Sequence, residues 1–259
     1  MTSVEKLTKS FEILKIPVQS YSDEQRKNDL KILNKKDKIT HLNLVCENIV
    51  AQNVREAEHF SRNLGLAIET FLVFFDDEDR DVYFVAEECL NKIFKTFMDN
   101  YLIRFPADLY RFMKKNGPER SLKAALTRFA EICHFIKPQK CRIYVDFMIK
   151  DNILSKIAKR SEESIQSVLV DSMNRICATF CPSMTDQEIH LLIQSFLPNL
   201  SNNSSVNSYR RVSANCLSLI CLYTASPLKS YHYLHGELLN LIHPIDENIE
   251  FGEFYYVFV

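Results

Sequence analysis

The sequence predicts an all-α protein, more specifically an α-solenoid of HEAT-type helical-hairpin repeats. The first observation is repetition, because the amphipathic segment that begins at Asp81 is followed by similar segments that begin at Ser121, Ser164 and Ser208. Successive segments begin 40, 43 and 44 residues apart, a period typical of HEAT and armadillo repeats. The second observation is that only four of 259 residues are glycine, which disfavours tight β-hairpins and Gly-rich phosphate loops.

The four segments also agree position by position. Asp81, Ser121, Ser164 and Ser208 are predicted N-caps, since their side-chain oxygens can accept a first-turn amide hydrogen. The positions one, four, nine and twelve residues further on are apolar and share one stripe of a 3.6-residue helix, so we expect them to form the core. These four columns are Val82, Leu122, Ile165 and Tyr209; Val85, Ala125, Val168 and Val212; Leu90, Ala130, Met173 and Leu217; and Ile93, Cys133, Ile176 and Ile220.

Composition sets limits on function. The formal charge of −1 gives no overall field that would attract nucleic acid, so no nucleic-acid partner is expected. Residues 1–16 carry charges throughout and do not resemble a signal peptide, so the eight cysteines are expected to be reduced thiols in the cytosol. No apolar run approaches the roughly 20 residues that cross a bilayer.

Residues 1–18 are predicted to form an amphipathic helix. Val4, Leu7, Phe11 and Leu14 step by three or four residues and share one helical stripe, and Pro17 ends the pattern. A helix this short is marginal alone in water, so its stripe is expected to need a partner. Two readings stay open: a mobile element that binds a membrane or another protein, and a helix that packs on the solenoid itself.

A polar, weakly basic linker is predicted at 19–38, and the HEAT-repeat solenoid at 39–259. The body should open near Thr40 with an apolar stripe in 42–50, followed by hairpins that pair 64–75 with 81–97, 105–115 with 121–136, 141–159 with 164–180, and 186–197 with 208–223. A fifth unit begins at Leu228. Because the apolar end at 254–259 does not suit a polar terminal cap, we expect a truncated part of a longer array.

Several blocks of consecutive residues carry a family resemblance that runs in order along nearly the whole chain. They are Glu5-Lys6-Leu7, 46–52 (CENIVAQ), 88–92 (ECLNK), 114–117 (KKNG), Arg120-Ser121-Leu122 and 138–142 (PQKCR). On these blocks the chain resembles the N-terminal region of the huntingtin family. The resemblance implies a large HEAT-repeat scaffold that binds huntingtin-associated and motor-adaptor proteins in vesicle and microtubule-based transport and in autophagy. It also implies a cytoplasmic location with nuclear shuttling and peripheral contact with vesicle membranes.

The opening helix departs from the family pattern. Gln19 stands alone where a polyglutamine tract would follow, so tract-driven aggregation is not expected. The positions of two regulatory serines in the family are occupied by Ile13 and Ile16. By resemblance, Ser3 is a candidate hydroxyl for modification, and the lysines that match positions of ubiquitin-type modification are Lys6, Lys9 and Lys15.

No motif in the sequence predicts an enzyme, a cofactor or a metal. His232 and His235 with Glu237 lack the HExxH order of zinc proteases. Cys177 and Cys181, with Cys133, His134 and Cys141, could be drawn as a metal site, but Cys133 stands in an apolar column, which favours core packing. The predicted function is therefore a non-enzymatic protein-interaction scaffold. The alternatives are a solenoid transport receptor or regulatory subunit, and a membrane-targeted adaptor that acts through residues 1–18.

Overall fold

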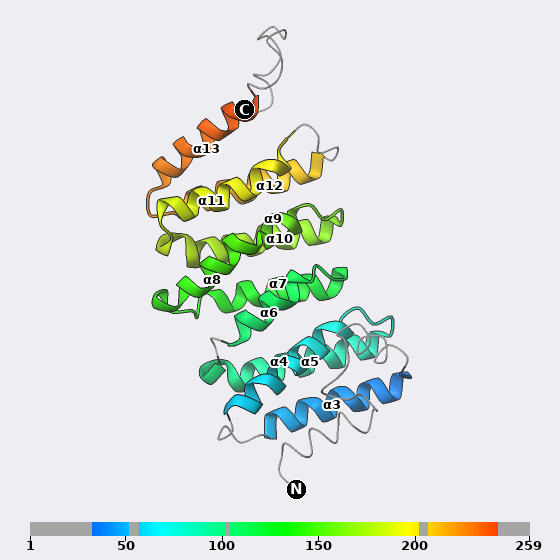
Figure 1. Cartoon of the computed structure of the whole chain (residues 1–259). Helices are drawn as coiled ribbons and strands as arrows, with labels where there is room; N and C mark the ends of the chain where they lie inside the picture. The colour runs from blue at the N-terminus through cyan, green and yellow to red at the C-terminus, as the bar shows by residue number, and fades with distance from the viewer. Residues whose placement is uncertain (1–32, 52–56, 102–103, 202–206, 243–259) are drawn as a thin grey trace.

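The computed structural model describes residues 33–51, 57–101, 104–201 and 207–242, which form a stack of α-helices (Figure 1). The α-helices are α3 (Lys35–Ala51), α4 (Ala57–Phe74), α5 (Arg80–Tyr101), α6 (Arg104–Lys114), α7 (Glu119–Cys133), α8 (Pro138–Asp151), α9 (Ile153–Ala158), α10 (Glu163–Phe180), α11 (Asp186–Phe196), α12 (Asn207–Tyr223) and α13 (Pro227–Ile242). Two short 3₁₀ helices, η1 (Cys181–Ser183) and η2 (Leu197–Asn199), follow α10 and α11.

The helices pair into hairpins that stack along one axis. α4 pairs with α5, α6 with α7, the broken helix α8–α9 with α10, and α11 with α12, while α3 packs on α5 and α13 packs on α11 and α12. The helices α3, α5, α7, α10 and α12 form what we call the second-helix row. The prediction of an all-α solenoid is confirmed, and no strand occurs in the described ranges. None of the described helices is long and apolar enough to cross a membrane.

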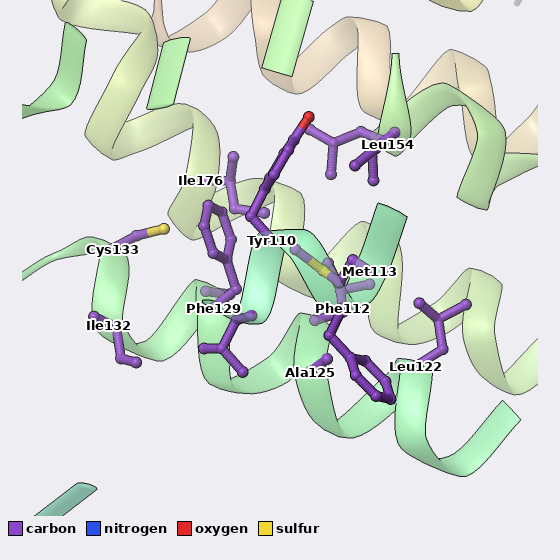
Figure 2. Packing of buried hydrophobic residues seen from close by; sticks show 14 of the residues in the cluster. Tyr110, Phe112, Met113, Leu122, Ala125, Phe129, Ile132, Cys133, Leu154 and Ile176 are labelled. Carbon is purple, nitrogen blue, oxygen red and sulfur yellow. The ribbon is translucent and has the colours of Figure 1, made fainter. Parts of the chain in front are cut away.

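The predicted apolar columns form the core. Ile93, Cys133, Ile176 and Ile220, the last column, are completely buried, and the column nine residues into each segment is buried as well. Val85 and Val168 are half-buried but pack against the core, whereas Tyr209 is half-buried at its helix start. Figure 2 shows the part of this core around Phe129 and Tyr110. The four repeated helices thus bury the stripe that the sequence predicts.

The prediction that Asp81 and Ser121 are N-caps is wrong. α5 begins one residue before Asp81, whose amide donates to Asp79 Oδ1 at 2.9 Å. α7 begins at Glu119, and Asp76 Oδ1, from the preceding hairpin, accepts the amides of Arg120 at 3.0 Å and of Ser121 at 3.3 Å. Upstream aspartates therefore satisfy the free amides of both first turns.

Ser164 and Ser208 are also inside their helices, as the second residue of α10 and of α12. The Ser164 hydroxyl bonds to Glu119 and accepts a hydrogen bond from Lys123 Nζ at 3.2 Å, so it joins α10 to α7. Ser208 Oγ accepts a hydrogen bond from Gln166 Nε2 at 3.4 Å, which joins α12 to α10. The repeated hydroxyls at 164 and 208 link neighbouring hairpins instead of capping their own helices.

The segment 141–159, predicted as one helix, is two helices. Asn152 adopts φ 51° and ψ 36°, the left-handed region, and separates α8 from α9. Asparagine tolerates this conformation better than most residues, so it can place a bend where no glycine or proline marks one.

The solenoid body begins earlier than predicted. α3 starts at Lys35 rather than near Thr40, so its first residues lie in the stretch assigned to the linker. Asn34 caps this helix, because its Oδ1 accepts the Asp37 amide at 2.9 Å. The amphipathic segment 1–18, linker residues 19–32 and the apolar end at 254–259 lie outside the described residues.

Candidate protein-interaction groove

An open groove of about 950 Å³ lies in the second-helix row between α5 and α7. Elsewhere in the row, α3 packs closely on α5, α7 on α10, and α10 on α12, but no comparable packing joins α5 to α7. Figure 1 shows that the spacing between the ribbons of α5 and α7 is wider than the spacing between α7 and α10. α4, which packs on α6 and α7, maintains the stack on the other side, so the groove opens along one side only.

Side chains from three helices and one loop line the groove. They are Phe75 and Glu78 from the loop before α5; Arg80, Tyr83 and Glu87 from α5; Arg120, Lys123, Ala124, Thr127, Arg128 and Glu131 from α7; and Ser164, Ser167 and Val168 from α10. On α7 the positions 120, 124, 127 and 131 are spaced by three or four residues, so one partly exposed stripe of this helix forms a whole wall.

Two arginines of α7 bridge the groove near its ends. Arg120 Nη1 donates to the Asp77 carbonyl at 3.3 Å, and Arg128 Nη2 donates to Asn91 Oδ1 of α5 at 2.5 Å. Eight residues separate these arginines, which corresponds to about 12 Å along a helix axis. The groove therefore has room for several side chains of a bound segment between the two bridges.

Aromatic side chains form an apolar patch at the α5 wall. The Tyr83 ring lies edge-on to Phe75, with centroids 5.2 Å apart, and 5.4 Å from the Phe84 ring. The Arg80 guanidinium lies over Phe84 at 5.1 Å, which is a cation–π contact. Phe84 is 46% exposed, although a large aromatic side chain gains free energy on burial. Such an aromatic patch beside arginine is typical of protein-binding surfaces.

The two walls differ in charge. The α7 wall carries the basic Arg120, Lys123 and Arg128 with one acid, Glu131, whereas the α5 side carries the acidic Glu78 and Glu87 with one base, Arg80. Burial and the neighbouring Glu87 raise the pKa of Tyr83, while Arg120 and Arg128 act in the opposite direction. Both arginines are therefore close enough to the Tyr83 hydroxyl to favour its ionised form.

Part of the basic charge is paired within the chain. Lys123 Nζ lies 3.1 Å from Glu119 Oε1, and Arg128 Nη1 lies 2.8 Å from Glu131 Oε2. The Arg120 side chain instead donates to a backbone carbonyl. Arg120 thus carries a formal charge that a carboxylate of a binding partner can neutralise.

A second hollow of about 570 Å³ adjoins the groove along α5. It shares Glu87 with the groove, and it is lined by Phe84, Glu87, Glu88, Asn91, Lys92, Lys95 and Thr96. The α5 surface is therefore accessible over several turns, with Glu87 at the junction of the two depressions and Phe84 in the second one.

The site residues predicted from the sequence lie outside the described residues. This holds for the proposed binding stripe Val4, Leu7, Phe11 and Leu14 and for the modification candidates Ser3, Lys6, Lys9 and Lys15. The sequence did not predict the groove, because most of its lining residues are polar positions outside the apolar columns, and Val168 was assigned to the core. The regular spacing of exposed arginine, threonine and glutamate on 120–131 is the signal that could have indicated a binding wall.

The cysteines whose side chains the structure describes behave as core residues. Cys133, Cys177 and Cys181 are completely buried, which confirms the packing interpretation. A hydrogen bond with Cys181 and burial raise the pKa of the Cys177 thiol, so it stays protonated. His134, His232 and His235 are exposed. Among the described residues, no three His, Cys, Asp or Glu side chains come together in a way that could hold a metal ion.

Comparisons with known proteins agree with this architecture. A family model described as "Huntingtin, N-terminal HEAT 1" matches residues 71–226. Huntingtin of Takifugu rubripes is 41% identical over 253 residues, which cover 95% of this chain and 8% of the fish protein. An "HD protein homolog" of Dictyostelium discoideum is 34% identical over 118 residues, which cover 46% of this chain and 4% of that protein.

A crystal structure of an engineered protein is also similar, at 15% sequence identity and a TM-score of 0.37, with 95% of this chain and 91% of that chain covered. That score is too low to support a conclusion. The chain spans less than a tenth of the length of the two relatives. The family model covers more than half of the chain and the fish relative matches almost all of it, so the chain belongs to the huntingtin family and corresponds to its N-terminal HEAT-repeat region.

Proposed function

We propose that this chain is a non-enzymatic scaffold that binds other proteins through its second-helix row, with the α5–α7 groove as the main contact. The single observation that carries the proposal is the groove itself, whose lining combines the half-buried Tyr83, next to the exposed Phe84, with three basic side chains of α7. A bound segment can bury apolar side chains against Phe84 and Tyr83 while its carboxylates pair with Arg120. Membership of a HEAT-repeat family supports this role, because stacked hairpins present long binding surfaces.

The finer role follows the family. We propose that the scaffold acts in vesicle and microtubule-based transport and in autophagy, and that its partners include motor-adaptor proteins. We also propose a cytoplasmic location with nuclear shuttling and peripheral vesicle contact. The transport-receptor and membrane-adaptor alternatives predict different partners: a defined cargo, or anionic lipid bound by residues 1–18.

Affinity capture from cell extract tests the scaffold role. The intact chain is compared with the double variant Arg120→Glu/Arg128→Glu, and the control is Lys150→Glu/Lys159→Glu, which makes the same charge change on exposed lysines outside the groove. We expect the groove variant to lose partners that the control retains, with motor-adaptor and vesicle proteins among them. A partner set that is identical for both variants would contradict the groove as the main contact.

A further inference from the structure

We propose that the amphipathic segment 1–18 docks into the α5–α7 groove of its own chain. The first observation is where the described chain begins. Lys35, at the start of α3, pairs with Asp79 at 3.1 Å and with Asp81 at 2.5 Å, and Lys38 pairs with Asp77 at 2.7 Å. Glu78 and Arg80, the sequence neighbours of Asp79, line the groove. The N-terminal segment is therefore attached to the body beside the mouth of the groove.

The connecting residues are long enough for this return. Fourteen residues, 19–32, separate the segment from the described body. A flexible chain of that length has an average end-to-end distance of roughly 20 Å, and a tether this short gives an effective concentration on the order of 1 mM. Contacts that would be too weak to hold a separate peptide are thus sufficient within one chain.

The apolar stripe of the segment matches the apolar side chains of the groove. Val4, Leu7, Phe11 and Leu14 need a surface to cover them, since a short amphipathic helix is marginal alone. The groove offers the half-buried Tyr83, Ala124 and Val168, and Phe84 is exposed beside it. Burial of a large apolar side chain such as Phe11 stabilises the docked state.

The charges beside the stripe match the two walls. In a helix, Glu5 and Glu12 lie seven residues apart on one flank of the stripe, and Lys6 lies on the other. Seven residues span about 10 Å, close to the spacing of Arg120 and Arg128 on α7. One orientation therefore places the two glutamates toward Arg120 and Arg128 of α7, and Lys6 toward Glu78 and Glu87 on the α5 side. Lys15, in the last turn, is basic but lies on the same flank of the stripe as Glu5 and Glu12.

The docking itself is independent of the scaffold function. Its regulatory consequence rests on the proposed function, because a docked segment covers the surface that partners are proposed to use. Partners and the segment then compete for one groove, and release of residues 1–18 exposes both the groove and the amphipathic stripe. The test below uses no partner, so its outcome is separate from that of the capture experiment.

Tryptophan fluorescence of the full chain measures docking directly. The sequence contains no tryptophan, so Phe11→Trp introduces one reporter on the apolar stripe. We expect its emission to be blue-shifted and protected from acrylamide quenching relative to the same chain in denaturant. Both effects should be independent of protein concentration, because the contact is intramolecular.

A charge exchange identifies the groove as the docking site. In the Phe11→Trp chain, Glu5→Lys/Glu12→Lys and Arg120→Glu/Arg128→Glu should each abolish the blue shift and the protection, and the two pairs combined should restore them. Lys150→Glu/Lys159→Glu is the matched control and should change neither. Circular dichroism verifies that helix content is retained, and the variants at positions 5 and 12 lie outside the solenoid body.

Three results would overturn the proposal. One is an emission spectrum equal to that of the denatured chain. Another is a blue shift that survives both charge reversals, which would place the segment elsewhere, for example on the outer side of α3. The third is protection that rises with protein concentration, which would indicate contact between chains.

Discussion

Arg160 shows how single side chains hold neighbouring hairpins together. From the loop before α10, its guanidinium Nη1 donates to the carbonyls of Asn116 at 3.1 Å and Gly117 at 2.9 Å, and its Nε donates to Glu162 at 3.1 Å. Asn116 adopts φ 46° in the turn between α6 and α7, and the arginine satisfies carbonyls of that turn. One cation thus fixes the second hairpin against the third.

Replacement of Arg160 should therefore weaken the stack. Charge-assisted hydrogen bonds of this kind contribute roughly 1.5–3 kcal/mol, and we expect Arg160→Ala to lower the free energy of unfolding by about 2 kcal/mol. Urea denaturation followed by circular dichroism measures the change. Arg175→Ala, which removes an exposed arginine of α10, is the control and should stay within about 0.5 kcal/mol of the parent chain.

His41 predicts a dependence of stability on pH. The side chain is buried in α3, and this burial lowers its pKa to about 4, below the 6.5 expected of an unfolded chain. The unfolded state then binds the proton more tightly, so the contribution of His41 is fully present above pH 6.5 and is lost as the pH falls toward 4. From the difference between a pKa of 6.5 and one of about 4, the predicted loss is about 3 kcal/mol.

Denaturant titrations at several pH values test this slope. His41→Leu keeps an apolar side chain in the core and should remove most of the slope between pH 6.5 and 4. Persistence of the full slope in His41→Leu would show that other groups cause it. Neither Arg160 nor His41 could be predicted from sequence, because their roles depend on a turn 44 residues away and on burial.

At the scale of single helices, the sequence predicts most of the structure because hydrophobic periodicity survives in each element. The helices predicted at 105–115, 164–180 and 208–223 agree with α6, α10 and α12 within a few residues. The break at Asn152 was missed, because the apolar pattern continues across it from α8 into α9. The N-caps were missed because Asp76 and Asp79 act from upstream positions.

Asn152 should be sensitive to the type of residue that replaces it. At φ 51°, a β-carbon costs roughly 1–2 kcal/mol in most residues, whereas glycine adopts this conformation freely. We expect Asn152→Ala to destabilise the protein by about 1 kcal/mol and Asn152→Gly to be close to neutral. Equal loss in both variants, measured as a shift in the denaturation midpoint, would mean that the side chain rather than the backbone matters.

Across the whole molecule, one core runs from hairpin to hairpin. Phe129 of α7 lies 6.4 Å from the ring centroid of Tyr110 in its own hairpin and 6.3 Å from that of Phe180 in the next one. Such continuity is typical of solenoids, in which each repeat is stabilised by its neighbours. No sequence pattern predicts the groove, because the groove depends on the spacing between α5 and α7. No single segment determines that spacing.

Truncation of Phe129 should therefore affect the entire stack. Removal of a completely buried phenylalanine costs about 3–5 kcal/mol, so Phe129→Ala should lower the thermal midpoint of the whole protein. Phe135→Ala removes a side chain that is 49% exposed and should have a much smaller effect. Similar losses in the two variants, measured by differential scanning calorimetry, would contradict a continuous core.

The wide spacing between α5 and α7 also has a mechanical consequence. A rod made of tightly stacked layers bends most readily at its most loosely stacked level, which here lies between the first two hairpins. At that level the two bridging arginines connect α7 to the α5 side, and α4 packs on α6 and α7. These few contacts are where we expect the stack to bend. A segment bound beside Tyr83 is expected to limit bending at that level, and so to restrict the angle between the first hairpin and the hairpins that follow.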